Sequence, residues 1–193
     1  QRERPRRGAG AARSAGGRGV RWLRQAEVLH QPARDGDVAV GAGAAQAPVA
    51  DGFTQRDPDE GRPATERTEV RILFDDTAVY IGARMFDGEP TRIERRLSSR
   101  DSDADADRLT VFLDPMRDKL TGAIFRVSAA NVQQDAALYN DSWWDGTWDA
   151  VWQSQVSADE QGWIAELRIP LSQLRFANAE RQTWGINIER FVR

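Results

Sequence analysis

Short segments in which apolar and polar residues alternate follow one another from residue 68 to the end of the chain. Successive side chains of a β-strand point to opposite faces, so a period of two predicts strands with one buried face. Turn-forming residues such as Asp75-Asp76 and Asp114-Pro115 separate the segments. The pattern predicts an antiparallel β-sandwich of about nine short strands, jelly-roll or immunoglobulin-like, with hardly any helix. The clearest expected strands cover residues 68–74, 78–86, 109–113, 123–128, 131–139, 150–156, 163–169 and 183–192.

Residues 1–44 differ in composition from the rest of the chain. They consist mainly of arginine, glycine and alanine, and their nine arginines stand against four acidic residues, a net charge of +5. The remainder carries 18 basic and 26 acidic residues, a net charge of −8. Because a segment with so few large apolar residues buries too little surface to offset the entropy of ordering, we expect residues 1–44 to be disordered. The β-sandwich is assigned to residues 45–193.

Two other interpretations of residues 1–44 stay open. A basic arm can bind nucleic acid, but these arginines are scattered, Trp22 is the single aromatic residue among them, and the body of the chain is acidic. We therefore expect no nucleic-acid partner. Arginine also supplies 26 of the 27 basic residues, which indicates a GC-rich gene. A sequence rich in Arg, Gly and Ala results when such a gene is translated out of frame, so residues 1–44 could be a product of this kind.

Several classes of chemistry are excluded by composition. The chain has no cysteine, and His30 is its one histidine, so neither a thiolate site nor a histidine-based catalytic triad is expected. No run of about 18 apolar residues could form a membrane helix, and no secretory signal is visible. No pair of carboxylates has the apolar surroundings that would raise one pKa, so no catalytic residue is assigned, and whether the complete protein is an enzyme stays open.

The strongest indication of function is a tryptophan-rich segment, residues 140–152. It holds four of the seven tryptophans, interleaved with aspartates around Gly146. Because so polar a turn-forming sequence is not expected to be buried throughout, some indoles should lie at the surface. Indole faces stack on the C–H faces of sugars, and carboxylates and amides bind sugar hydroxyls. The alternative for any one tryptophan is a partly buried position in the hydrophobic core. We predict sugar contacts for Trp143, Trp144, Trp148, Asn140, Asp141 and Asp145, and core positions for Trp152, Trp163 and Trp184.

A second candidate site is an acidic run with carboxylates at alternate positions. Its members are Asp101, Asp103, Asp105 and Asp107. The spacing of oxygen ligands is typical of calcium loops, but the run lacks the glycine at the sixth position and the glutamate at the twelfth that an EF-hand requires. We keep the four aspartates as candidates for a structural calcium ion of another type, and assign no other cofactor.

Five sequence blocks, at residues 68–82, 107–115, 148–152, 162–170 and 182–187, resemble the family 9 carbohydrate-binding module and its relatives. They are most similar to the version found at the amino-terminal side of large bacterial proteins whose remainder is an outer-membrane or secreted region of unassigned function. The resemblance covers residues 47–193. It implies an antiparallel β-sandwich, an exported location, sugar binding by tryptophan stacking and, often, bound calcium.

The residues and the resemblance together predict a non-catalytic carbohydrate-binding domain of a larger exported protein involved in carbohydrate catabolism. Its expected partners are an oligo- or polysaccharide and a C-terminal domain of the same full-length chain, with no membrane contact by this domain. The resemblance leaves room for a glycoside-hydrolase activity elsewhere in the full-length protein. The alternative is a structural β-sandwich without a sugar site, which packs against a C-terminal membrane-barrel region.

Overall fold

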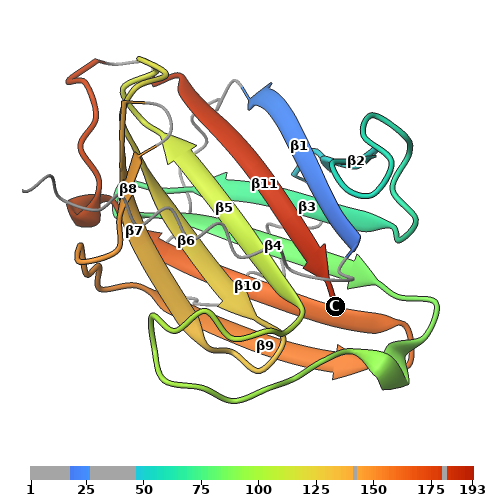
Figure 1. Cartoon of the computed structure of the whole chain (residues 1–193). Coiled ribbons are helices and arrows are strands. Elements are labelled where there is room, and N and C mark those ends of the chain that lie inside the picture. Colours follow the sequence, from blue (N-terminus) through green and yellow to red (C-terminus); the bar gives the residue numbers. More distant parts are fainter. Residues whose placement is uncertain (1–17, 27–46, 141–142, 180–181) are drawn as a thin grey trace, which may run out of the picture.

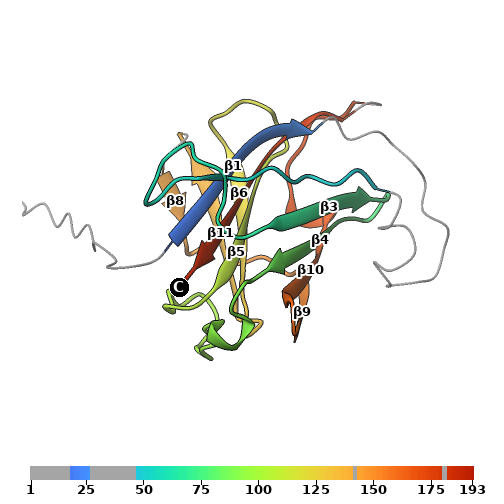
Figure 2. The ribbon, with the colours of Figure 1, turned by 90° about the vertical axis from the view of Figure 1, so that its right-hand side faces the viewer.

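The computed structural model describes residues 18–26, 47–140, 143–179 and 182–193. These residues form two antiparallel sheets that face each other (Figures 1 and 2), which confirms the predicted β-sandwich. The larger sheet has seven strands in the order β2-β1-β11-β5-β6-β7-β8, and the smaller has four in the order β3-β4-β10-β9. No helix in this described part of the chain has the length and apolar character needed to cross a membrane. The elements are β1 (Arg18–Ala26), β2 (Thr54–Gln55), β3 (Thr68–Phe74), β4 (Ala78–Phe86), the 3-10 helix η2 (Pro90–Arg92), β5 (Arg108–Asp114), β6 (Gly122–Ser128), β7 (Gln133–Tyr139), β8 (Trp143–Asp145), β9 (Gln153–Asp159), β10 (Gly162–Pro170), the 3-10 helix η3 (Leu171–Gln173) and β11 (Trp184–Val192).

The core lies between the two sheets and is built from the alternating apolar residues. In the smaller sheet, β4 and β10 pair along their whole length, so that Met85 lies opposite Trp163 and Ile81 opposite Leu167, all four buried. The larger sheet contributes the inward residues of β5, β6 and β11, Phe125 among them. The predicted core positions of Trp152, Trp163 and Trp184 are confirmed, since all three are buried.

The structure departs from the expected strands within the tryptophan-rich segment. A strand was expected over residues 150–156, but β9 begins only at Gln153, and a short strand, β8, lies upstream at Trp143–Asp145. The reason is a side chain of the opposite sheet. The backbone N–H of Ala150 donates to Asp135 Oδ1 at 2.7 Å, and the indole Nε1–H of Trp152 donates to Asp135 Oδ2 at 2.9 Å. Residues 150–152 are therefore bound to β7 and do not extend β9.

Strand β1 lies inside the segment that the sequence predicts to be disordered. It pairs with β11 over nine positions, from Arg18 opposite Val192 to Ala26 opposite Trp184, and it separates β11 from β2. The composition of the segment gave no sign of this, because a ladder uses backbone N–H and C=O groups, which any residue other than proline supplies. The open edge of β11 needs such a partner. Residues 1–17 and 27–44 lie outside the described residues.

Candidate functional site

Strand β8 places the two adjacent tryptophans on opposite faces of the sheet. It forms the edge of the larger sheet (Figure 1), where Trp143 lies opposite Tyr139 and Trp144 opposite Leu138 on β7. Neighbouring residues of a strand point to opposite sides. Asp135 of β7 shares a face with Tyr139 and lies opposite the core residue Phe125. Trp144 therefore lies on the outer face of the larger sheet, the face turned away from the smaller sheet.

A row of polar side chains crosses this outer face beside Trp144. Glu189 of β11, Thr110 of β5, Arg126 of β6 and Gln134 of β7 are successive cross-strand partners. Arg126 donates from Nε to Thr110 Oγ1 at 3.0 Å and from Nη1 to Gln134 Oε1 at 2.8 Å. These two bonds fix the position of the guanidinium, which donates more N–H groups than these two bonds use.

The indole of Trp144 is fixed against this row. The guanidinium carbon of Arg126 lies 5.8 Å from the centroid of the Trp144 ring, within the range of a cation–π contact. Half of the Trp144 side chain remains exposed. A large aromatic ring that is supported by the protein and half open to solvent is suited to stacking, because little freedom is lost when a ligand binds.

Trp143 has a different environment. Its side chain is 75% exposed, and Tyr139, its cross-strand neighbour, is also exposed. The two aromatic residues lie at the edge of the sheet on the opposite face from Trp144. Both tryptophans of β8 are therefore surface residues, as the sequence predicts, but they cannot contribute to one flat platform.

The other predicted sugar contacts are less open. The ring of Trp148 packs edge-on against Phe125, with centroids 5.9 Å apart, and is half-buried, so the prediction of an open stacking face is not supported there. Asp145 Oδ1 accepts the backbone N–H of Thr147 at 2.9 Å and its hydroxyl at 2.7 Å. These bonds lower the pKa of Asp145 and hold the turn after β8. Asn140 is exposed in a left-handed turn, with φ of 51°, and Asp141 lies outside the described residues.

The four aspartates of the acidic run do not converge on one point. Each has its own partners. Asp101 accepts the backbone N–H of Asp135 and pairs with Arg100, and Asp103 lies near Arg108 and Arg126. Asp105 pairs with Arg193, and Asp107 accepts the backbone N–H of Glu94. Among the described residues, no three acidic or histidine side chains are grouped so that they could hold a metal ion. The geometry therefore does not support these four aspartates as a shared calcium site.

Comparison with known proteins identifies the family. The family model described as "Carbohydrate family 9 binding domain-like" matches residues 43–191. The chain belongs to this family. Two solved structures of a family 9 carbohydrate-binding module from Caldicellulosiruptor kristjanssonii share its fold. The complex with glucose has 17% sequence identity and a TM-score of 0.51, and the match covers 83% of each chain. The complex with cellotriose has 18% identity and a TM-score of 0.50, and the match covers 83% of this chain and 81% of that one. No curated protein sequence matches the chain significantly.

Sequence reasoning did not identify Arg126 and Gln134 of this family 9 domain as neighbours of the tryptophan platform. Their outward direction could have been inferred, because Arg126 lies between Phe125 and Val127 in an alternating strand. Their alignment depends on the register of β6 with β7, and their place beside Trp144 depends on that of β7 with β8. A shift of one residue in either pair would turn one of these side chains to the other face. The sequence alone does not specify these registers.

Asp107 gives a test of the structure through the pH dependence of stability. Burial raises its pKa to about 6, and its Oδ1 is buried without a hydrogen-bond partner. Between about pH 4 and pH 6, Asp107 is still protonated in the folded state but already ionised in the unfolded state. The free energy of unfolding therefore falls as the pH rises through this window. We expect Asp107→Asn, which stays neutral, to gain stability relative to the wild type by on the order of 2 kcal/mol between pH 4 and pH 7. Urea denaturation at each pH measures this, and parallel pH profiles would contradict it.

Proposed function

We propose that the domain is a non-catalytic carbohydrate-binding module that stacks a sugar ring on Trp144, at the edge of the outer face of the larger sheet. The observation that carries this proposal is the half-exposed indole fixed beside the guanidinium of Arg126. The polar row next to it supplies donors and acceptors for sugar hydroxyls. The related family 9 structures are complexes with glucose and with cellotriose, which supports a carbohydrate as the class of ligand.

The proposed mode of binding predicts weak affinity for a single domain. One aromatic platform with a few hydrogen bonds gives dissociation constants of roughly micromolar to millimolar, because association also costs translational and rotational freedom. Attachment to a larger exported protein would raise the effective concentration of the ligand. Such a protein, with a C-terminal domain and a role in carbohydrate catabolism, forms part of this proposal, and Trp143 with Tyr139 would offer a further contact on the opposite face.

Replacement of Trp144 tests the proposal directly. We expect Trp144→Ala to weaken binding of cellotriose or another soluble oligosaccharide by about tenfold or more, since it removes the stacking surface. Isothermal titration calorimetry on the folded chain measures the effect. Trp143→Ala is the matched control, because it removes an indole of the same strand from the opposite face, and a smaller effect is expected. Wild-type affinity in Trp144→Ala, for a saccharide that binds the wild type, would overturn the assignment of the platform.

A second candidate function, a docking domain, is favoured by the distribution of exposed apolar side chains. Three segments meet at one end of the larger sheet, where Asp114 lies opposite Gly185 and Gly122 opposite Leu138. Most of the exposed large apolar residues of the described chain belong to these segments: Met116, Leu120, Tyr139, Trp143, Trp144 and Phe176. Exposed apolar side chains that are concentrated in one region are common at protein interfaces. If no saccharide binds the folded domain, this docking function becomes the better interpretation.

A further inference from the structure

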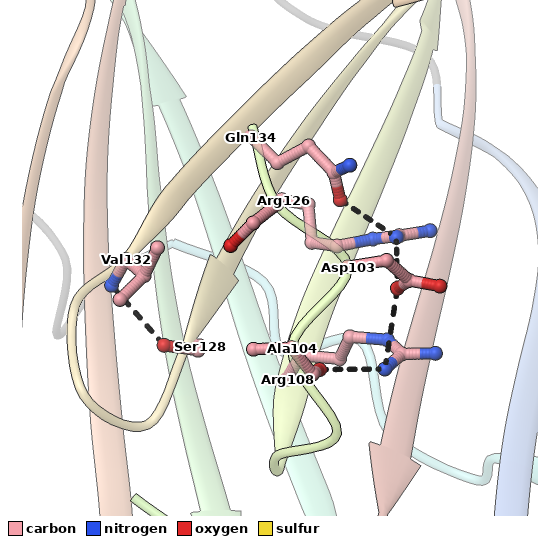
Figure 3. A pocket seen from close by; sticks show the side chains of 8 residues that line it. Asp103, Ala104, Arg108, Arg126, Ser128, Val132 and Gln134 are labelled. Atoms are coloured by element: carbon pink, nitrogen blue, oxygen red, sulfur yellow. Dashed lines mark hydrogen bonds and ion pairs between the residues drawn. The ribbon is translucent and has the colours of Figure 1, made fainter. Parts of the chain in front are cut away.

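Two arginines of the outer face lie next to the Trp144 platform and share one carboxylate. The side chains of Arg126 on β6 and Arg108 on β5 run side by side, and Asp103 lies between their guanidinium groups (Figure 3). Asp103 Oδ1 is 3.7 Å from Arg126 Nη1 and 3.9 Å from Arg108 Nη1. Both distances exceed those of hydrogen bonds, so Asp103 is an ion-pair partner without a directed contact to either arginine.

The positive charge of the pair is poorly compensated. The side chains of Arg126 and Arg108 are only 17% and 20% exposed, whereas that of Asp103 is 76% exposed. Burial lowers the pKa of Arg126, and the neighbouring charge of Arg108 lowers it further. The charges of Asp103 and Glu189 act in the opposite direction, but Glu189 is also paired with Arg56 at 3.3 Å. The buried Nε of Arg108 has no hydrogen-bond partner. Buried cations are stable when an anion is close and well oriented, and this arrangement leaves room for a better anion than Asp103.

The two guanidinium groups are held in position without a ligand. Arg126 is bonded to Thr110 and Gln134, as described above. Arg108 lies with its guanidinium carbon 4.2 Å from the ring centroid of Phe191 and donates to the carbonyl of Ala104 at 3.4 Å. A cavity of about 20 Å³ lies between them and residues 102–104, with space on the order of one water molecule or one carboxylate oxygen. Preorganised donors of this kind cost little entropy when they bind.

We propose that the preferred ligand is an acidic saccharide, and that the carboxylate of a uronic acid residue binds between Arg108 and Arg126 in place of the Asp103 side chain. This inference rests on the proposed sugar-binding function and adds the substrate class. Arginine is suited to carboxylates because its planar fork can donate two parallel hydrogen bonds. The guanidinium carbon of Arg126 lies 5.8 Å from the centroid of the Trp144 ring, so the arginine pair borders the platform. When one ring of a saccharide stacks on the open face of Trp144, the carboxylate of that ring or of the neighbouring ring would therefore have the arginine pair within reach.

The test compares acidic sugars with their neutral counterparts by calorimetry on the whole chain. The probes are glucuronate against glucose, the β-1,4-linked trimer of glucuronate against cellotriose, and sodium acetate as an anion without a sugar. We expect each uronate to bind at least tenfold more tightly than its neutral counterpart, with the preference decreasing as salt is raised. Arg108→Met should bring the ratio of the two affinities toward one. Asp103→Asn should raise uronate affinity several-fold, because it removes the competing carboxylate. Arg92→Met, which removes an exposed arginine outside the site, is the charge-matched control and should keep the ratio.

Each contrary outcome has a separate meaning. Equal affinity for uronates and neutral sugars would overturn the acidic-saccharide inference and leave the sugar-binding function standing. Acetate binding as tight as that of glucuronate would overturn it as well, because the arginines would then be a simple anion site. Absence of binding by any saccharide would overturn both proposals. If Arg108→Met does not fold, Asp103→Asn decides, since its side chain is exposed, and an unchanged uronate affinity in that variant would count against the inference.

Discussion

Asp135→Ala is expected to destabilise the domain by about 3–5 kcal/mol, because it removes the one acceptor that several buried donors share. The Asp135 carboxylate is fully buried and accepts the backbone N–H of Ala150, the indole N–H of Trp152 and a guanidinium N–H of Arg100. Without it, the buried N–H groups of Ala150 and Trp152 lose their acceptor, while Arg100 keeps its bond to the carbonyl of Ala150. Chemical denaturation gives the free energy of unfolding, and the emission of Trp152 should shift to longer wavelength if residues 150–152 detach from β7.

The same arginine provides a matched control. Arg100 also pairs with Asp149 at 3.2 Å, but the Asp149 side chain is 79% exposed. Exposed ion pairs contribute little, so Asp149→Ala should cost less than about 1 kcal/mol. Similar losses in the two variants would show that Asp135 does not anchor the segment. Asp135→Asn should lie between them, because an amide keeps one acceptor oxygen.

This anchor explains where sequence reasoning on the fold succeeded and where it failed. Alternation located β4 and β10 well, since their inward residues are uniformly apolar and the core selects that pattern. It misplaced the start of β9, because Asp135 interrupts the apolar face of β7 and takes the backbone of Ala150 as a partner. It also missed β1, whose pairing with β11 is set by backbone groups. Strands that are specified by burial were predictable, whereas those specified by long-range polar contacts were not.

The candidate site shows the same division. Exposure of Trp143 and Trp144 followed from the polar, turn-forming sequence around them. The edge-on contact of Trp148 with Phe125 could not be predicted from the sequence, since the two residues are 23 positions apart and nothing local distinguishes Trp148 from its neighbours. The arginine pair was also missed. Arg108 and Arg126 become neighbours only through the register of β5 with β6.

Arg190→Met is the second change for which we expect a large loss of stability, again about 3–5 kcal/mol. Arg190 is fully buried and joins β11 of the larger sheet to the smaller sheet. Its Nη1 donates to the carbonyl of Phe86 at 2.6 Å and to that of Arg67 at 3.2 Å, and its Nη2 donates to Asp87 Oδ2 at 3.3 Å. Methionine fills much of the same volume but removes these donors, and within the described part of the chain only the carbonyl of Arg67 keeps another, the backbone N–H of Phe86 at 2.9 Å. Arg84→Met is the control, since Arg84 binds the half-exposed Asp159 at 2.7 Å at the surface, and a loss of about 1 kcal/mol or less is expected there.

The pH dependence of the Arg190 effect separates lost charge from lost packing. The positive charge of Arg190 holds down the pKa of the buried Asp107, which burial has raised to about 6. Without Arg190, this pKa should rise further. At pH 5 Asp107 is mostly protonated with or without Arg190, so the variant leaves no unpaired charge on it, whereas at pH 8 the variant loses the cation that compensates the buried carboxylate. The loss of stability in Arg190→Met should therefore be larger at pH 8 than at pH 5. A loss that is equal at both values would mean that Arg190 acts through packing and its bonds to carbonyl oxygens. A negligible loss at both would show that an apolar side chain replaces this buried cation without cost.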